Sequence, residues 1–119
     1  MLFRSAKLLG ALDAVSEPDG STLLDHTIVV MCGEIGSTNH TNFMVNNVLA
    51  GGGSVLKTGR YLSLPRTTPT TRLPGDFYPN AGLPHNNLFV SLANVMGMSS
   101  VTTFGNPQAC TGAMPMLHV

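Results

Sequence analysis

The residue best placed to do chemistry in this sequence is a glutamate that follows an apolar segment. Residues 27–32 are β-branched and apolar, which predicts a strand, and Glu34 stands two residues beyond its end. We expect this strand to be central in a parallel sheet and buried on both faces. Glu34 would then lie at the carboxyl edge of the sheet, where open α/β folds bind their ligands.

The charge environment of Glu34 favours a functional role. Between Asp25 and Lys57 it is the only Asp, Glu, Lys or Arg, so burial would be unfavourable unless the carboxylate met a metal, a distant arginine or a proton. The alternative is a carboxylate that caps the amides of residues 36–39 or faces solvent. We name Glu34 as a candidate metal ligand.

His40 is the second candidate, six residues further along in the polar segment 36–42. It could fold back beside Glu34 as a metal ligand or as a general acid or base, and the alternative is an exposed loop histidine. Cys32 shares a strand face with Glu34, although we expect it to be a small buried apolar residue and not a nucleophile. His26 lies eight residues before Glu34, roughly 26 Å along a strand, and cannot share its site.

Two other polar residues are candidate anion ligands. Segment 51–58 imitates a phosphate-binding loop, but Leu56 stands where that motif requires glycine, so we reject it. Arg60 then belongs to a turn between strands and is a candidate partner for an anion. Asn86 lies at a predicted helix start, where free amides bind anions, with ordinary capping as the alternative.

The elements around these residues predict an α/β fold. Helical spacing of apolar residues predicts an amphipathic helix over 8–15, and strands are predicted at 27–32, 43–50 and 60–64. Five prolines in 65–84 predict a long irregular loop, and a well-buried second helix follows Pro84 and ends near Gly97. We expect a mostly parallel sheet flanked by helices, in one domain over residues 1–119.

The composition bounds the partners. Six basic and six acidic residues give zero net charge, which argues against nucleic acid and anionic membranes. No apolar run approaches the roughly 20 residues of a membrane span, and Arg4 and Lys7 disqualify the first twelve residues as a signal peptide. Cys32 and Cys110 are expected to be free, mostly buried thiols.

The scarcity of charge points to a covered surface. Charged residues make up 10% of the chain, against about 25% in typical globular domains, and none follows Asp76. An independent domain normally keeps more charge on its surface. We therefore expect either a homo-oligomer or docking onto a missing amino-terminal half.

An ordered series of short motifs resembles a known family. The motifs are LLDHTIVV at 23–30, Gly33-Glu34, LAGGG at 49–53, LKTGR at 56–60, PHNNL at 84–88 and Met96-Gly97. From about Leu8 onward they resemble the carboxy-terminal part of a family of exported bacterial proteins of unknown function, common in planctomycetes and myxobacteria. That family is similar to the alkaline-phosphatase and sulfatase superfamily.

The resemblance implies a partial alkaline-phosphatase-like domain with a metal-assisted site for phosphate or sulfate esters at the strand ends. Glu34 matches the position of an Asp-His metal pair, with Ile35 where the histidine would be, and the metal would be zinc, calcium or manganese. The nucleophile and first metal ligands would come from amino-terminal strands without a counterpart here. The chain would then be a fragment or short relative of a metal-dependent ester hydrolase, inactive alone. The alternative is a non-catalytic structural or interaction protein that self-associates through low-charge faces.

Overall fold

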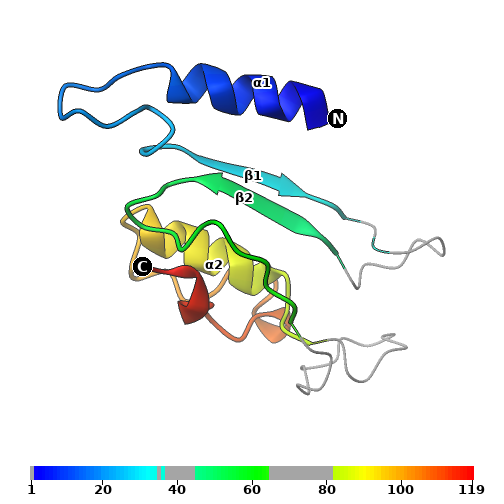
Figure 1. Cartoon of the computed structure of the whole chain (residues 1–119). Coiled ribbons are helices and arrows are strands. Elements are labelled where there is room, and N and C mark those ends of the chain that lie inside the picture. Colours follow the sequence, from blue (N-terminus) through cyan, green and yellow to red (C-terminus); the bar gives the residue numbers. More distant parts are fainter. Residues whose placement is uncertain (1, 35, 37–44, 65–81) are drawn as a thin grey trace.

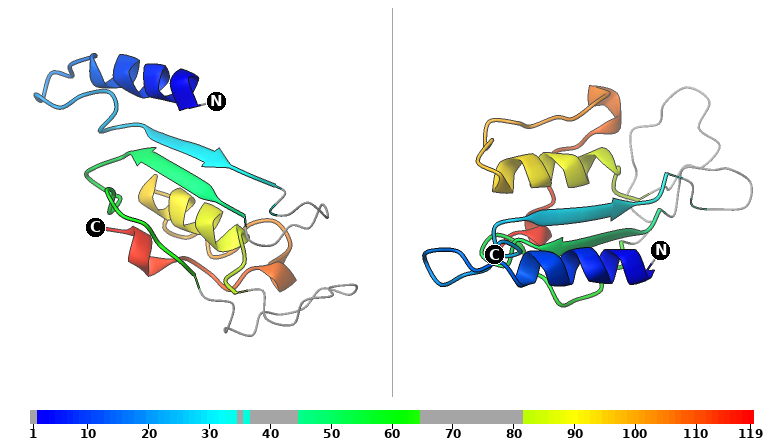
Figure 2. Two further views of the ribbon diagram at one scale, coloured as in Figure 1. Left: turned by 45° about the vertical axis from the view of Figure 1, so that its right-hand side comes forward. Right: turned by 90° about the horizontal axis from the view of Figure 1, so that it is seen from above.

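The part of the chain that the structure describes forms two α-helices and one β-hairpin. The computed structural model describes residues 2–34, 36, 45–64 and 82–119. The elements in chain order are α1 (Leu2–Asp13), β1 (Ile28–Cys32), β2 (Asn47–Gly51), α2 (Asn86–Val95) and the short 3-10 helices η1 (Pro107–Ala109) and η2 (Pro115–Leu117). The two α-helices lie on opposite sides of the hairpin (Figures 1 and 2).

The strands run antiparallel, so the prediction of a mostly parallel, alkaline-phosphatase-like sheet is wrong. Ile28 of β1 lies opposite Gly51, and Cys32 lies opposite Asn47, in a sheet of two strands. A parallel pair needs a crossover connection, usually a helix. The polar segment 36–42 lacks the apolar periodicity of such a helix, which favours an antiparallel return. The apolar character of β1 identified a strand but could not show the direction of its neighbour.

β1 is also less buried than predicted. Four of its residues are half-buried, and Cys32 is exposed. On the face toward α2, Ile28 packs with Leu49 of β2 against the core. The strand therefore lies at the boundary of the packed body and not in its centre.

Two glycines at the end of β2 allow it to lie close to the segment that precedes β1. Gly51 and Gly52 have φ angles of 78° and 61°, a region that favours glycine. A Cβ atom at Gly51 would stand 2.1 Å from the carbonyl oxygen of Thr27. The Gly52 N–H donates to the carbonyl oxygen of Leu24 at 3.1 Å. This bond holds the end of β2 beside the start of β1.

The segment after β2 pairs with the carboxy-terminal tail. The Lys57 N–H donates to the carbonyl oxygen of Leu117 at 3.0 Å, and the Val119 N–H donates to that of Val55 at 3.2 Å. Residues 60–64 have no regular structure and are exposed, so the strand predicted there is wrong. The tail thus pairs with residues 55–57, which the sequence analysis had not assigned to a strand.

α2 confirms the predicted second helix and contributes Leu88 and Val90 to the core. It begins at Asn86 and ends at Val95, and Gly97 follows with a φ of 90°, as expected beyond a helix end. The buried hydrophobic side chains of the described residues are Leu56, Leu88, Val90, Met114 and Leu117. The core is therefore formed by one helix, the segment after β2 and the tail.

Two buried polar side chains of α2 hold the tail. Asn87 and Ser91 are 2% and 0% exposed. Asn87 accepts from the Thr111 N–H at 2.9 Å and donates to Thr111 Oγ1 at 2.7 Å, while Ser91 Oγ accepts from the Met114 N–H at 2.6 Å. These bonds satisfy backbone amides of an irregular segment that would otherwise lack partners inside the protein.

α1 confirms the helix that the apolar spacing predicts at the start of the chain. Ser5, Leu9 and Leu12 are half-buried and mark the face toward the body, whereas Phe3 and Leu8 are 93% and 50% exposed. Among the described helices, none has the length and apolar character to cross a bilayer.

Replacing Asn87 with alanine tests the attachment of the tail. Asn87→Ala should lower the free energy of unfolding by about 1–3 kcal/mol, because the Thr111 N–H loses its buried acceptor. The matched control Asn46→Ala alters an exposed amide and should change the free energy of unfolding by less than about 0.5 kcal/mol. Urea denaturation of the three proteins measures the difference. Equal stability of the two variants would contradict this role of Asn87.

Candidate functional site

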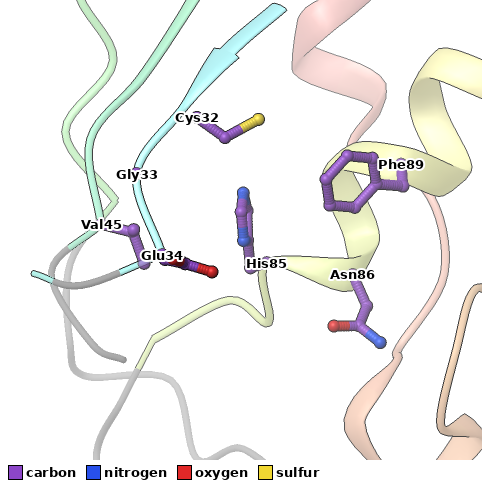
Figure 3. A pocket seen from close by; sticks show the side chains of 7 residues that line it. All are labelled: Cys32, Gly33, Glu34, Val45, His85, Asn86 and Phe89. Atoms are coloured by element: carbon purple, nitrogen blue, oxygen red, sulfur yellow. The ribbon is translucent and has the colours of Figure 1, made fainter. Parts of the chain in front are cut away.

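Glu34 lies at the rim of an open pocket where the hairpin meets the first turn of α2. The pocket has a volume of about 540 Å³ and is lined by Cys32, Gly33, Glu34, Val45, His85, Asn86 and Phe89. Figure 3 shows the Glu34 side chain extending from the end of β1 toward the wall formed by α2. The structure therefore brings together two of the predicted site residues, Glu34 and Asn86.

His85 also lines the pocket, and from the sequence it was considered only as part of the helix start 85–87, a candidate anion site. Its Nε2 lies 2.9 Å from Oδ1 of Asn47, at the start of β2. With the amide oxygen facing the ring, Nε2 carries the proton and donates, so in the neutral imidazole Nδ1 is the acceptor nitrogen. This bond ties the start of α2 to the hairpin and fixes the imidazole in the pocket wall.

Phe89 supports the His85 ring from the next helical turn. The two ring centroids are 5.1 Å apart at an interplanar angle of 54°, and Phe89 in turn stacks on Phe104 at 4.9 Å. The spacing of four residues on a helix places these side chains side by side. That spacing of a histidine and an aromatic residue at a helix start is the signal that could have identified this wall.

Asn86 is engaged in holding the tail. Its Nδ2 donates to the carbonyl oxygen of Phe104 at 2.7 Å. The charged side chain of the pocket is the carboxylate of Glu34, which repels anions. Both observations argue against an anion at Asn86 and favour a neutral polar or cationic ligand in the pocket.

Arg60, the other predicted anion ligand, lies elsewhere. Its Nε donates to the carbonyl oxygen of Lys57 at 2.9 Å, and its guanidinium also donates to the carbonyl oxygen of Met116. It does not line the pocket of Glu34. In the structure Arg60 links the turn after β2 to the tail.

The described residues do not form a complete metal site. No three His, Cys, Asp or Glu side chains among them lie close enough together to hold one ion. Glu34 is present at the pocket, but His40, the predicted metal ligand and catalytic residue, lies outside the described residues. Glu34 with Cys32 and His85 does not fit a metal centre as it stands, so no chemical step is derived through a metal.

The two thiols are free, as predicted, but not mostly buried. Cys32 is exposed at the end of β1, and Cys110 is half-buried beyond η1. Cys32 borders the pocket, although nothing in its surroundings among the described residues singles it out as a nucleophile.

A polar turn at the opposite end of β1 positions the strand. The pKa of Asp25 is held below its usual range because the Thr22 N–H donates to the carboxylate at 2.8 Å and Thr22 Oγ1 donates at 3.0 Å. His26 is exposed, with its Nε2 2.7 Å from Ser21 Oγ and 3.4 Å from the carboxylate of Asp19. His26 is thus part of this turn, separated from Glu34 by the whole of β1, as the sequence analysis predicted.

In comparisons with known proteins, no family model, no curated protein and no solved structure matches this chain. The functional argument therefore depends on the residues and geometry described above.

The turn before β1 gives a prediction for acid unfolding. The lowered pKa of Asp25 means that its carboxylate contributes stability above its unfolded pKa, near 3.9, and that this contribution is lost as the pH falls through the lower folded value. Asp25→Asn should therefore show a smaller loss of stability on acidification than the parent chain. Urea denaturation at a series of acidic pH values measures this.

A graded control comes from the donor side. Thr22→Val removes the Oγ1 donor and keeps the N–H donor, which is the larger cause of the lowered pKa of Asp25. Its acid profile should lie between those of the parent and Asp25→Asn. Superimposable profiles of Asp25→Asn and the parent would show that the turn does not contribute in this way.

Proposed function

We propose that this chain is a non-catalytic structural or interaction protein that self-associates through its low-charge faces. The observation that carries this proposal is the imbalance between its core and its surface. Among the described residues, the exposed large hydrophobic side chains outnumber the buried ones. A protein that works as a monomer normally buries such side chains or scatters them among charges.

The exposed apolar side chains occur on several elements. Phe3 and Leu8 lie on α1, and Val48 lies on β2. Others lie after α2, within the carboxy-terminal tail. In the stretch that directly follows α2, Met96 is 61%, Met98 53% and Phe104 49% exposed. This last group lies in the part of the chain beyond Asp76, which contains no Asp, Glu, Lys or Arg. Burial of about 25 cal/mol per Å² of such surface would favour association.

Self-association can be measured directly. Analytical ultracentrifugation should give a mass well above the 12.5 kDa of one chain at high protein concentration, falling toward that value on dilution. High salt should leave the association largely intact, because apolar burial, unlike attraction between exposed charges, is not screened. A mass of 12.5 kDa at every concentration would contradict the proposal.

A second proposal keeps the hydrolase hypothesis, favoured by the placement of Glu34 at an open pocket after β1. In it, Glu34 is one ligand of a divalent metal, and His40 is a second. The chain then supplies part of a site for a phosphate or sulfate ester, inactive alone. The pocket geometry supports the position of Glu34 but supplies no complete ligand set among the described residues.

Metal analysis tests this second proposal. After incubation with zinc, calcium or manganese and removal of the free ion, the parent chain should retain stoichiometric metal by mass spectrometry. Glu34→Gln should lose at least about tenfold in affinity because a neutral amide replaces the anionic ligand. Glu17→Gln, a matched substitution in the connection between α1 and β1, should retain it. A parent chain that retains none of the three metals would rule the proposal out.

A further inference from the structure

The outer edge of β1 carries backbone groups that no described residue satisfies. The Gly33 N–H donates to the carbonyl oxygen of Asn46 at 3.2 Å, which makes this a hydrogen-bonded pair of the hairpin. By the alternation of an antiparallel ladder, Met31 and Val29 also form such pairs with β2. The N–H and C=O groups of the residues between them point the other way, away from β2. These residues are Ile28, Val30 and Cys32.

This edge has none of the features that normally protect an edge strand. Natural sheets place lysine, proline or a bulge on exposed edges, because free backbone groups pair readily with another strand. The five residues of β1, IVVMC, contain no charge and no proline, and the register with β2 runs without a bulge. A two-stranded hairpin is also only marginally stable by itself. β1 is therefore suited to accept a further strand.

A groove beside this edge would receive the side chains of an added strand. It has a volume of about 310 Å³, and its lining by Leu92 and Met96 places it on the side of the hairpin that faces α2. Its lining residues are His26, Thr27, Ile28, Val30, Leu92 and Met96. A strand added to β1 would continue the sheet beneath the end of α2 and cover Met96, which is 61% exposed.

We propose that the added strand is β1 of a second copy of this chain, paired antiparallel across a two-fold axis at Val30. The two hairpins would then form one four-stranded sheet in the order β2, β1, β1, β2. In this register Val30 lies opposite Val30 of the second copy, and Ile28 lies opposite Cys32. The backbone groups that point outward in one copy meet their equivalents in the other, as an isologous interface requires.

The polar groups at the two ends of β1 favour the second copy as the occupant. His26 and Glu34 lie four residues before and four residues after Val30, and both are exposed. Antiparallel pairing about Val30 places the His26 of each copy near the Glu34 of the other, so that an imidazole, which can donate a hydrogen bond, meets a carboxylate, which accepts one, at both ends. An isologous pairing of this strand thus has apolar pairs in its centre and complementary polar groups at its ends.

This inference depends on the self-association proposed above and names the surface and the partner. Its test uses the same lysine substitution on two strands. Val30→Lys should raise the dissociation constant of the dimer at least about tenfold, because it sets two like charges opposite each other at the axis. Val48→Lys, at a 52% exposed position of β2, should change it less than about twofold. Analytical ultracentrifugation measures both, and circular dichroism reports whether each variant is folded.

Cross-linking keeps the test decisive if Val30→Lys does not fold. In a Cys32→Ser, Cys110→Ser background, Val30→Cys should form a disulfide-linked dimer on mild oxidation. Directly opposed residues of a hydrogen-bonded pair have Cα atoms about 5.5 Å apart, within the range of a disulfide. Val48→Cys in the same background should be linked less, although Val48 is exposed and Val30 is half-buried. Random collision would give the reverse order.

The outcomes separate the two proposals. A monomeric parent chain overturns both. An oligomeric parent whose dissociation constant is the same with Val30→Lys overturns the β1 interface and leaves self-association through another surface. Failure of Val30→Cys to link more than Val48→Cys overturns the axis at Val30. Weakening by Val30→Lys together with preferential linking of Val30→Cys supports the interface, and preferential linking alone supports it if Val30→Lys is unfolded.

Discussion

The rest of the structure depends on the attachment of an irregular carboxy-terminal tail to one helix. The buried side chains of Asn87 and Ser91 in α2 accept hydrogen bonds from the backbone N–H groups of Thr111 and Met114. Once held, the tail contributes Met114 and Leu117 to the core. It also hydrogen-bonds to the segment after β2, and through it to the hairpin. Two polar side chains thus organise an apolar core that has few other constraints.

That arrangement explains why so much apolar surface is left outside. The core lies on one side of the hairpin, between α2, the tail and residues near Leu56. Of the described elements, α1 lies on the opposite side, and it turns a narrow stripe of half-buried residues toward the body. A hairpin of two short strands is too narrow to bury the apolar side chains on both of its faces. The backbone groups at its outer edges also stay unpaired. The same small sheet that positions Glu34 therefore also exposes β1 to a partner.

The sequence predicted elements better than it predicted their arrangement. α2, with its proline before the start and its glycine after the end, and β1, with its β-branched run, were found from local signals that act within a few residues. The direction of β2 was missed because an apolar run is equally compatible with a parallel and an antiparallel neighbour. The tail was expected to be irregular, but its bonds to Asn87 and Ser91 join residues more than twenty positions apart. No periodic pattern encodes such contacts.

For the candidate site, too, the sequence predicted where one residue lies but not which residues surround it. Glu34 was identified because burial of an unpaired carboxylate after an apolar strand is unfavourable unless it has a partner. In the structure it does line a pocket. Its partners could not be read from neighbouring positions, since His85 comes from α2, brought close by the Asn47 bond. The two proposals now assign Glu34 different partners, a divalent metal or the His26 of a second copy. Because one carboxylate cannot fully bind both, metal binding and β1 pairing would weaken each other, a reciprocity that follows from linkage.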